Sequence, residues 1–252
     1  MLKIKGIYKS FGGLTALKNV SFTVNNGCIS SLIGPNGAGK TTLMNIITGI
    51  YGPDTGEVIF LDKQVNNLPP TKIALLGISR TFQHLELFSN MTVLENVMVA
   101  RHIKTKAGLI SSGFRLPSAR REERETEKKA EEILEYIGLS HRKNELSSNL
   151  PVGEQRILEI ARALATEPKL LLLDEPAAGL NIKETKRLGE TIISILKDKG
   201  ITILLVDHDM ELVMKISNWI TVLNFGEVIA DGTAHDVQRD PAVIKAYLGA
   251  EE

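Results

Sequence analysis

Short apolar segments alternate with polar segments along most of the chain, and their spacing predicts a mixture of strands and helices. Three segments near the N-terminus have the alternating or β-branched pattern of strands: Leu2–Tyr8, Leu17–Val24 and Glu57–Leu61. Cys28–Ile33 is a short apolar segment that stops abruptly at Gly34, which is typical of a buried strand that enters a glycine-rich loop. Thr42–Gly49, after this loop, is predicted to be a helix.

Two further apolar segments in the second half of the chain are predicted to be buried strands. Leu170–Leu173 ends at Asp174, and Ile201–Val206 ends shortly before His208. The helical patterns around them cover Glu154–Thr166 and Lys183–Lys199. Strands that alternate with helices in this order predict a parallel sheet covered on both faces. Because such sheets bind ligands at the carboxyl ends of their strands, we expect the residues that follow these strands to share one site.

The middle of the chain has a different pattern. Residues 119–132 form a dense run of mixed charge, and the apolar positions Ala130, Ile133, Leu134 and Ile137 at its end and just after it fall on one helical face. We predict an exposed helix with one packed side. Residues 101–118 mix glycine, serine and basic residues and are typical of a loop-rich insertion. We therefore place a helical subdomain at residues 85–149 of a single domain that spans residues 1–252.

Composition narrows the choice of function classes. The 252 residues are enough for one large α/β domain or for a core with a small attached subdomain. The formal net charge is zero, which counts against a nucleic-acid partner. The single cysteine, Cys28, can form neither an internal disulfide nor a multi-cysteine metal site. No apolar stretch approaches the roughly 20 residues of a membrane span, so we expect the chain not to cross a membrane.

The most specific motif follows the strand that ends at Ile33. Its sequence, Gly34-Pro35-Asn36-Gly37-Ala38-Gly39-Lys40-Thr41, fits the pattern G-x-x-x-x-G-K-[ST]. Glycines let backbone N–H groups approach phosphate oxygens, and the following helix offers its positive end. Lys40 is expected to pair with the β- and γ-phosphates, and the Thr41 hydroxyl with Mg²⁺. We assign nucleotide binding to Asn36, Gly37, Ala38, Gly39, Lys40, Thr41 and Thr42; the alternative, a glycine turn without a ligand, is disfavoured by the strand before it and the helix after it.

A pair of acids supplies the second half of this prediction. Asp174 and Glu175 follow the buried strand Leu170–Leu173, which places carboxylates beside the phosphate loop. Asp174 is expected to hold the Mg²⁺ shell, and Glu175 to polarise the attacking water as general base. Alone, an apolar segment followed by two acids also fits a strand that leaves the core. The phosphate loop makes that alternative the weaker one.

The order of these motifs resembles that of the ATPase subunits of ATP-binding-cassette (ABC) transporters. Five features match that family in order: the phosphate loop, Gln83 in Arg80-Thr81-Phe82-Gln83, Leu150–Glu154 before Ile160-Ala161-Arg162, Asp174-Glu175-Pro176, and His208. Within the family the chain most resembles the ATPases of branched-chain amino acid importers. That resemblance depends on Phe11-Gly12-Gly13, Arg80-Thr81-Phe82-Gln83, Ala177-Ala178-Gly179-Leu180-Asn181 and the ending Ala246-Tyr247-Leu248-Gly249.

The resemblance implies a fold and further site residues. The fold would be an α/β P-loop NTPase core with a mostly parallel sheet and an antiparallel β subdomain in residues 1–84 and 150–252, plus the helical subdomain. Phe11 would stack on adenine, although a core phenylalanine is the alternative. Gln83 would contact Mg²⁺ and the attacking water. His208 would contact the γ-phosphate and support Glu175, although a lone histidine is more often structural.

One segment departs from the family pattern. Where the family usually has Leu-Ser-Gly-Gly-Gln, this chain has Leu150-Pro151-Val152-Gly153-Glu154. Gly153 is retained before a helix, whose N-terminus could receive the γ-phosphate of ATP held by a second subunit. Pro151 removes the serine hydroxyl, and Glu154 adds a charge that repels phosphate unless it points away. The strength of ATP contact at this half-site stays open.

The function that follows is an ATP-hydrolysing subunit that powers import of branched-chain amino acids. The resemblance implies ATP and Mg²⁺ as cofactors and transmembrane permease subunits and a second ABC ATPase subunit as partners, with no nucleic acid. It implies a peripheral location at the cytoplasmic face of the cell membrane. The alternatives are a soluble ABC-type ATPase without a transport role and a nucleotide-dependent switch; the Asn-Lys-x-Asp word of guanine readers does not occur. The sequence names neither the solute nor the composition of the dimer.

Overall fold

The larger of the two sheets is mostly parallel. The computed structural model describes residues 1–83, 85–104 and 117–248. In spatial order, the six strands are β10 (Glu227–Gly232), β9 (Trp219–Asn224), β3 (Ile29–Ile33), β8 (Thr202–Val206), β7 (Leu170–Asp174) and β6 (Ile78–Arg80). All neighbours pair in parallel except β10 and β9. The predicted parallel sheet is therefore confirmed, with one antiparallel strand at its edge.

The second sheet is antiparallel and comes from the N-terminal part of the chain. Its strand order is β2 (Leu14–Val24), β1 (Leu2–Phe11), β4 (Thr55–Phe60) and β5 (Lys63–Gln64). Phe11 pairs with Leu14 at the tip of the hairpin that joins β1 and β2. All three predicted N-terminal strands exist: β1 and β2 each extend three residues further toward this tip than their patterns predict, and β4 starts two residues earlier and ends one residue earlier than predicted.

Alternation of side chains explains why the strands of the parallel sheet are apolar without interruption. In β7, Leu171 and Leu173 join the core under the helices, while Leu170 and Leu172 join a second core beneath the antiparallel sheet. Successive side chains of a strand point to opposite faces, so a strand covered on both faces is apolar at every position. Asp174 is the last residue of β7 and is itself buried.

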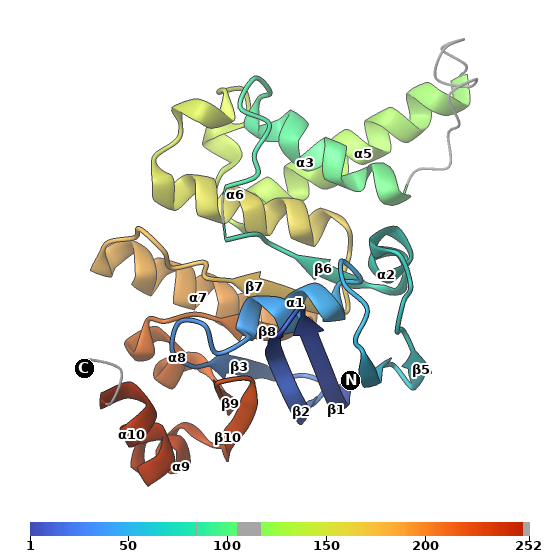
Figure 1. The fold of residues 1–252 in the computed structure, drawn as a ribbon. Helices are drawn as coiled ribbons and strands as arrows, with labels where there is room; N and C mark the ends of the chain where they lie inside the picture. The colour runs from blue at the N-terminus through green and yellow to red at the C-terminus, as the bar shows by residue number, and fades with distance from the viewer. Residues whose placement is uncertain (84, 105–116, 249–252) are drawn as a thin grey trace.

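The helices cover the parallel sheet on both faces (Figure 1). They are α1 (Lys40–Ile47), α2 (Pro70–Leu76), α3 (Val93–Arg101), α5 (Pro117–Tyr136), α6 (Val152–Ala165), α7 (Ile182–Lys199), α8 (Met210–Ile216), α9 (Ala234–Arg239) and α10 (Pro241–Leu248). The second of the two cores includes α1 together with the antiparallel sheet. Among the described helices, none is both long and apolar enough to span a bilayer.

Helices α3, α5 and α6 pack on one another and lie together at one end of the molecule (Figure 1). The predicted packed side of α5 is confirmed, because Ala130, Ile133, Leu134 and Ile137 are all buried. The loop-rich prediction for residues 101–118 is wrong at both ends, where α3 and a 3₁₀ turn precede residue 105 and α5 begins at residue 117. Residues 105–116 lie outside the described part.

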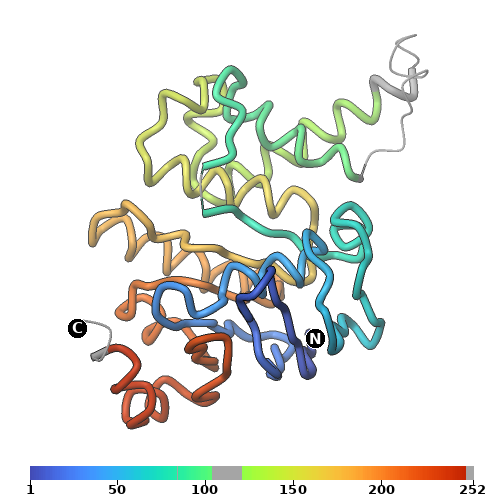
Figure 2. Tube along the Cα trace, in the orientation of Figure 1, coloured from blue at the N-terminus to red at the C-terminus, as the bar shows by residue number. Residues whose placement is uncertain are grey.

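The boundaries of the helical subdomain stay a prediction. The tube in Figure 2 shows the chain leaving the parallel sheet after β6, forming α3, α5 and α6, and returning to the sheet at β7. Helix α6 begins beyond the proposed boundary at residue 149, yet it packs on α3 and α5.

Candidate nucleotide site

The phosphate loop connects β3 to α1 and needs glycine at two positions for steric reasons. Gly34 has φ 151° and Gly39 has φ 104°, a region that side chains disfavour. A Cβ atom added to Gly34 would lie 2.0 Å from the Leu223 carbonyl oxygen, and one added to Gly39 would lie 2.7 Å from the Ala16 carbonyl oxygen. The loop is therefore wedged between β9 and the start of β2, and its backbone path is fixed.

The start of α1 is suited to an anion. Gly39 is the N-cap and supplies no side-chain cap, so the first N–H groups of the helix have no side-chain acceptor there. Asn36, Gly37 and Thr41 are exposed around it. Lys40 is buried, and its ammonium donates to the carbonyl oxygens of Gly34 at 2.6 Å and Pro35 at 2.9 Å. These groups form a cradle of backbone donors with a cation folded across it.

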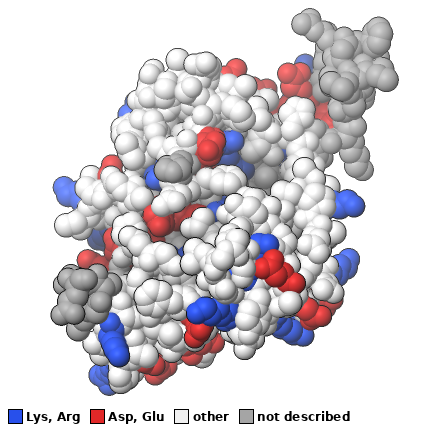
Figure 3. Space-filling view, in the orientation of Figure 1, with Lys and Arg blue, Asp and Glu red and all other residues white. Residues whose placement is uncertain are grey.

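The pKa of Lys40 reflects two opposing influences. Burial lowers the pKa of the ammonium, and the carboxylates of Glu175 and Asp174 act in the opposite direction. The phosphate loop and the two acids are thus close enough to interact electrostatically, as the sequence predicts. Figure 3 shows that basic and acidic side chains are interspersed over the visible face, in keeping with the zero net charge.

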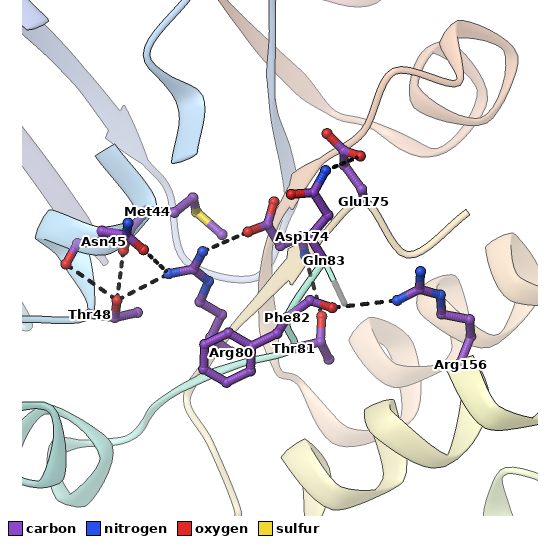
Figure 4. Close-up of polar contacts among 10 residues, drawn as sticks. All are labelled: Met44, Asn45, Thr48, Arg80, Thr81, Phe82, Gln83, Arg156, Asp174 and Glu175. Atoms are coloured by element: carbon purple, nitrogen blue, oxygen red, sulfur yellow. Dashed lines mark hydrogen bonds and ion pairs between the residues drawn. The ribbon is translucent and has the colours of Figure 1, made fainter. Parts of the chain in front are cut away.

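Asp174 is held by an arginine that sequence analysis did not single out as a site residue. Arg80, the last residue of β6, places its Nη2 2.6 Å from Asp174 Oδ2. Its Nη1 donates to Asn45 Oδ1 on α1 at 2.7 Å (Figure 4). Both members of the ion pair are more than nine-tenths buried, at 7% and 4% side-chain exposure. A guanidinium therefore joins β7 to the helix that follows the phosphate loop.

Glu175 takes an unusual backbone conformation directly after β7. Its φ is 47°, in the left-handed region that costs energy for a residue with a side chain. Its N–H donates to the Val206 carbonyl at 2.7 Å, and its Oε2 accepts a hydrogen bond of 2.9 Å from Gln83 Nε2. His208 Nδ1 lies 3.7 Å from the same oxygen, beyond hydrogen-bond distance. The predicted residues Gln83, Glu175 and His208 are therefore brought together.

We call Asp174 and Glu175, with their side-chain neighbours Arg80, Gln83 and His208, the acidic edge. The buried carboxylate of Asp207, which sequence analysis missed, holds the backbone next to the acidic edge. Asp207 accepts hydrogen bonds from three backbone N–H groups: those of Ala177, His208 and Asp209. Burial raises the pKa of this carboxyl group, and the three N–H donors oppose the shift. The available signal was its position as the first polar residue after an apolar strand.

Phe11 lies apart from these residues, at the end of β1. The residue is 43% exposed, so the alternative of a core phenylalanine is wrong. The ring makes an edge-to-face contact with Tyr51 at a centroid distance of 5.3 Å, and Lys9 Nζ lies 5.4 Å from its centroid. An exposed ring fixed at its edge leaves a face available for stacking. Tyr51 carried no sequence signal.

A family model described as ABC transporter matches residues 17–178, which is more than half of the chain. The chain belongs to the ABC transporter family. A second model, described as branched-chain amino acid ATP-binding cassette transporter, matches residues 227–252. The fold and the family predicted from the sequence are therefore confirmed, and the chain is an ATP-binding subunit of α/β fold.

Individual relatives agree over nearly the whole length. The high-affinity branched-chain amino acid transport ATP-binding protein LivG of Escherichia coli (strain K12) is 49% identical over 249 residues, which cover 99% of this chain and 98% of LivG. BraF of Pseudomonas aeruginosa, of the same description, is 46% identical over 99% of this chain and 98% of BraF. The solved ADP conformation of the ABC cassette MJ1267 has a TM-score of 0.86 and 36% identity, with 99% and 98% of the two chains covered.

The segment Leu150–Glu154, where the family usually has Leu-Ser-Gly-Gly-Gln, lies at the start of α6. Gly153 is in the first turn of α6, where an added Cβ atom would meet Glu184 Oε1 at 2.7 Å. The N-cap is Pro151, which supplies no side-chain cap. Glu154 pairs with Arg142 Nε at 3.4 Å, so a cation close by offsets its charge. The start of α6 is thus an uncapped helix N-terminus that lies against Glu184, and the acid in its own first turn, Glu154, is paired with Arg142.

Side chains of α6 contact the backbone on both sides of Gln83, at Phe82 and Glu86, and we call this part of the chain the Gln83 segment. Arg156 Nη1 donates to the Phe82 carbonyl at 3.4 Å (Figure 4), and Glu159 Oε1 accepts from the N–H of Glu86 at 3.1 Å. Arg156 and Glu159 also pair at 3.2 Å, and both are buried. Burial raises the pKa of Glu159. A movement of the backbone at Phe82 or Glu86 would therefore alter the contacts of α6.

The residues present fit Mg²⁺ bound together with a nucleotide. Within the described ranges, no group of three or more His, Cys, Asp or Glu side chains could hold a metal ion alone. Asp174 and Thr41 offer a carboxylate and a hydroxyl. Mg²⁺ is usually held by one or two such oxygen ligands together with substrate phosphates.

Proposed function

We propose that this chain is the ATP-hydrolysing subunit of an ABC importer for branched-chain amino acids, acting at the cytoplasmic face of the cell membrane. The main support is the convergence of the phosphate loop and the acidic edge, with Glu175 between Gln83 and His208. The solute is supported by the descriptions of LivG and BraF and by the second family model.

The chemistry follows from the positions of the side chains. Lys40 and the N–H groups at the start of α1 bind the β- and γ-phosphates, while Thr41 and Asp174 hold Mg²⁺. When bound, the ion neutralises charge on the phosphate oxygens. Glu175 orients and polarises the attacking water, and Gln83, which donates to Glu175 Oε2, positions this carboxylate. His208 contacts the γ-phosphate, and Phe11 stacks on adenine.

A second ABC subunit completes the site in this proposal. Gly153 packs against α7, and the uncapped N-terminus of α6 is suited to a phosphate held by another subunit. The relative MJ0796 is described as a dimer bound to ADP and Pi, at 28% identity and a TM-score of 0.78. Hydrolysis removes the phosphate that bridges the two subunits, and the Gln83 segment passes the change to transmembrane permease subunits.

The test separates binding from hydrolysis and from transport. Glu175→Gln should bind ATP like the parent protein and hydrolyse little, whereas Lys40→Ala should lose binding. Undiminished hydrolysis by Glu175→Gln would refute the role of Glu175. Affinity purification of Glu175→Gln from membranes in the presence of ATP should recover permease subunits; recovery of a soluble assembly instead would favour an ABC-type ATPase without a transport role.

A further inference from the structure

Arg80 connects two elements of the site, α1 and β7, through one buried guanidinium group. Nη2 contacts Asp174 Oδ2 at 2.6 Å, and Nη1 donates to Asn45 Oδ1 at 2.7 Å and to Thr48 Oγ1 at 3.4 Å. Asn45 and Thr48 belong to α1 or its C-cap, whereas Asp174 ends β7. Figure 4 shows the guanidinium between these two elements. The group therefore sets the spacing between the phosphate-loop helix and the acid predicted to hold Mg²⁺.

The ion pair between Arg80 and Asp174 also has an electrostatic role. A carboxylate with 4% side-chain exposure needs a nearby cation, because an unpaired buried charge is costly. Lys40 donates instead to two carbonyl oxygens of its own loop. Among the described residues, Arg80 is the cation that forms an ion pair with Asp174. It donates to Oδ2, and Oδ1 accepts no hydrogen bond from the described side chains.

The backbone around Arg80 strengthens the link. The next residue, Thr81, donates its N–H to the Leu172 carbonyl at 3.0 Å, and its hydroxyl accepts from the N–H of Asp174 at 3.3 Å. The end of β6 is thus tied to the end of β7 by both backbone and side chain. Gln83, which contacts Glu175, comes two residues later.

We propose that Arg80 is a positioning residue that holds the Asp174 carboxylate in register with the phosphate loop, so that one oxygen is fixed and the other is left for the magnesium shell. This inference rests on the proposed role of Asp174 in holding Mg²⁺. A partner that orients a ligating carboxylate typically changes metal affinity by about 10-fold to 100-fold when it is lost. Lysine cannot replace the fork, since a single ammonium does not span Asp174 and Asn45 with planar geometry.

The test measures how much Mg²⁺ strengthens nucleotide binding. The dissociation constant of N-methylanthraniloyl-ADP is determined in EDTA and in Mg²⁺, and the ratio of the two values is compared between variants. Arg80→Met should lower this ratio roughly tenfold or more. Affinity in EDTA should change little, because the phosphate loop is intact. A purely structural role would shift both constants together and leave the ratio unchanged, which would overturn the proposal.

Two milder variants decide the matter if Arg80→Met fails to fold. Arg80→Lys keeps the charge and should lower the ratio, and Asn45→Ala removes only the anchor on α1 and should lower it less. Ratios equal to that of the parent protein in both variants would also overturn the proposal. Arg101→Met is the matched control, because Arg101 pairs with Glu167, a residue outside the site, at 3.0 Å. It should keep the parental ratio.

Asp174→Asn distinguishes failure of this inference from failure of the proposed function. The variant should abolish most of the Mg²⁺ enhancement, and adding Arg80→Met to it should lower the ratio no further. An unaltered ratio in Asp174→Asn would contradict the magnesium role of Asp174 itself. A lowered ratio in Asp174→Asn with parental ratios in the Arg80 variants would contradict only the role of Arg80.

Discussion

The phosphate loop and the acidic edge face the same site but are built in different ways. The loop uses mainly backbone groups, and its shape depends on glycines wedged against carbonyl oxygens of β9 and β2. The acidic edge uses side chains from β6, β7 and the segment after β8, which contact one another over large separations in sequence. The comparison teaches that the loop depends on the path of its backbone and on close contacts of that backbone, whereas the positions of the acids depend on side-chain contacts between distant segments.

The strongest way to separate the two regions is to remove the charge of Glu175. In Glu175→Gln we expect steady-state ATP hydrolysis to fall by about 10²-fold to 10⁴-fold, the usual contribution of a general base. ATP affinity should stay within twofold because the loop is unchanged. Glu190→Gln, which neutralises an exposed acid on α7, should hydrolyse at the parental rate. A loss of ATP affinity in parallel with the rate would show that the two regions are not separable.

The next largest effect should come from the loop itself. Gly34→Ala places a methyl group 2.0 Å from the Leu223 carbonyl oxygen, a clash with backbone that cannot move freely. We expect a loss of about 3 kcal/mol in the free energy of unfolding. Urea denaturation measures it. Gly13→Ala, where an added Cβ atom meets nothing within 4 Å, should be nearly neutral. Equal stability of the two variants would contradict the wedged geometry.

A smaller effect tests whether the acidic edge needs its buried anchor. In Asp207→Asn, one acceptor oxygen becomes an amide donor, so at least one of three N–H groups loses its partner. We expect a loss of about 1–3 kcal/mol in the free energy of unfolding, with hydrolysis reduced more than ATP affinity. Asp198→Asn serves as control, since Asp198 accepts from Tyr136 in an exposed contact. Parental stability and hydrolysis rate in Asp207→Asn would show that the acidic edge does not depend on Asp207.

The smallest effect concerns the start of α6. Glu154→Gln removes an ion pair with Arg142 whose side chains are 18% and 34% exposed, so the free energy of unfolding should change by less than about 1 kcal/mol. If the uncapped helix N-terminus receives phosphate from a second subunit, neutralising Glu154 should strengthen ATP-dependent dimerisation. Sedimentation of the Glu175→Gln background with and without this change measures it. Weaker dimerisation would contradict that arrangement.

The difference between the two regions also explains what the sequence could predict. The phosphate loop is contiguous, so its pattern revealed every residue from Gly34 to Thr41. The apolar strands β7 and β8 were predicted because burial on both faces leaves an unbroken apolar segment. The contact between Arg80 and Asp174 joins residues 94 positions apart, and no local pattern encodes such a pair.

Other residues escaped prediction for related physical reasons. The three-residue strand β6 is too short for periodicity to reveal, so Arg80 was not placed at a strand end. Asp207 belongs to the polar run around His208, and its position directly after an apolar strand does not by itself reveal that it is buried. The glycines and serines of residues 101–118 favoured a loop, whereas α3 extends to Arg101 and α5 begins at Pro117.

Because Glu175 has a left-handed backbone, selection for stability and selection for ATP turnover should favour different residues at this position. Glycine at this position would relax a conformation that costs about 1–2 kcal/mol for a residue with a Cβ atom. Variants screened only for heat resistance should therefore drift toward glycine at position 175, while those screened for ATP turnover should keep the acid. The residue proposed as general base thus occupies a position where stability and ATP turnover favour different amino acids.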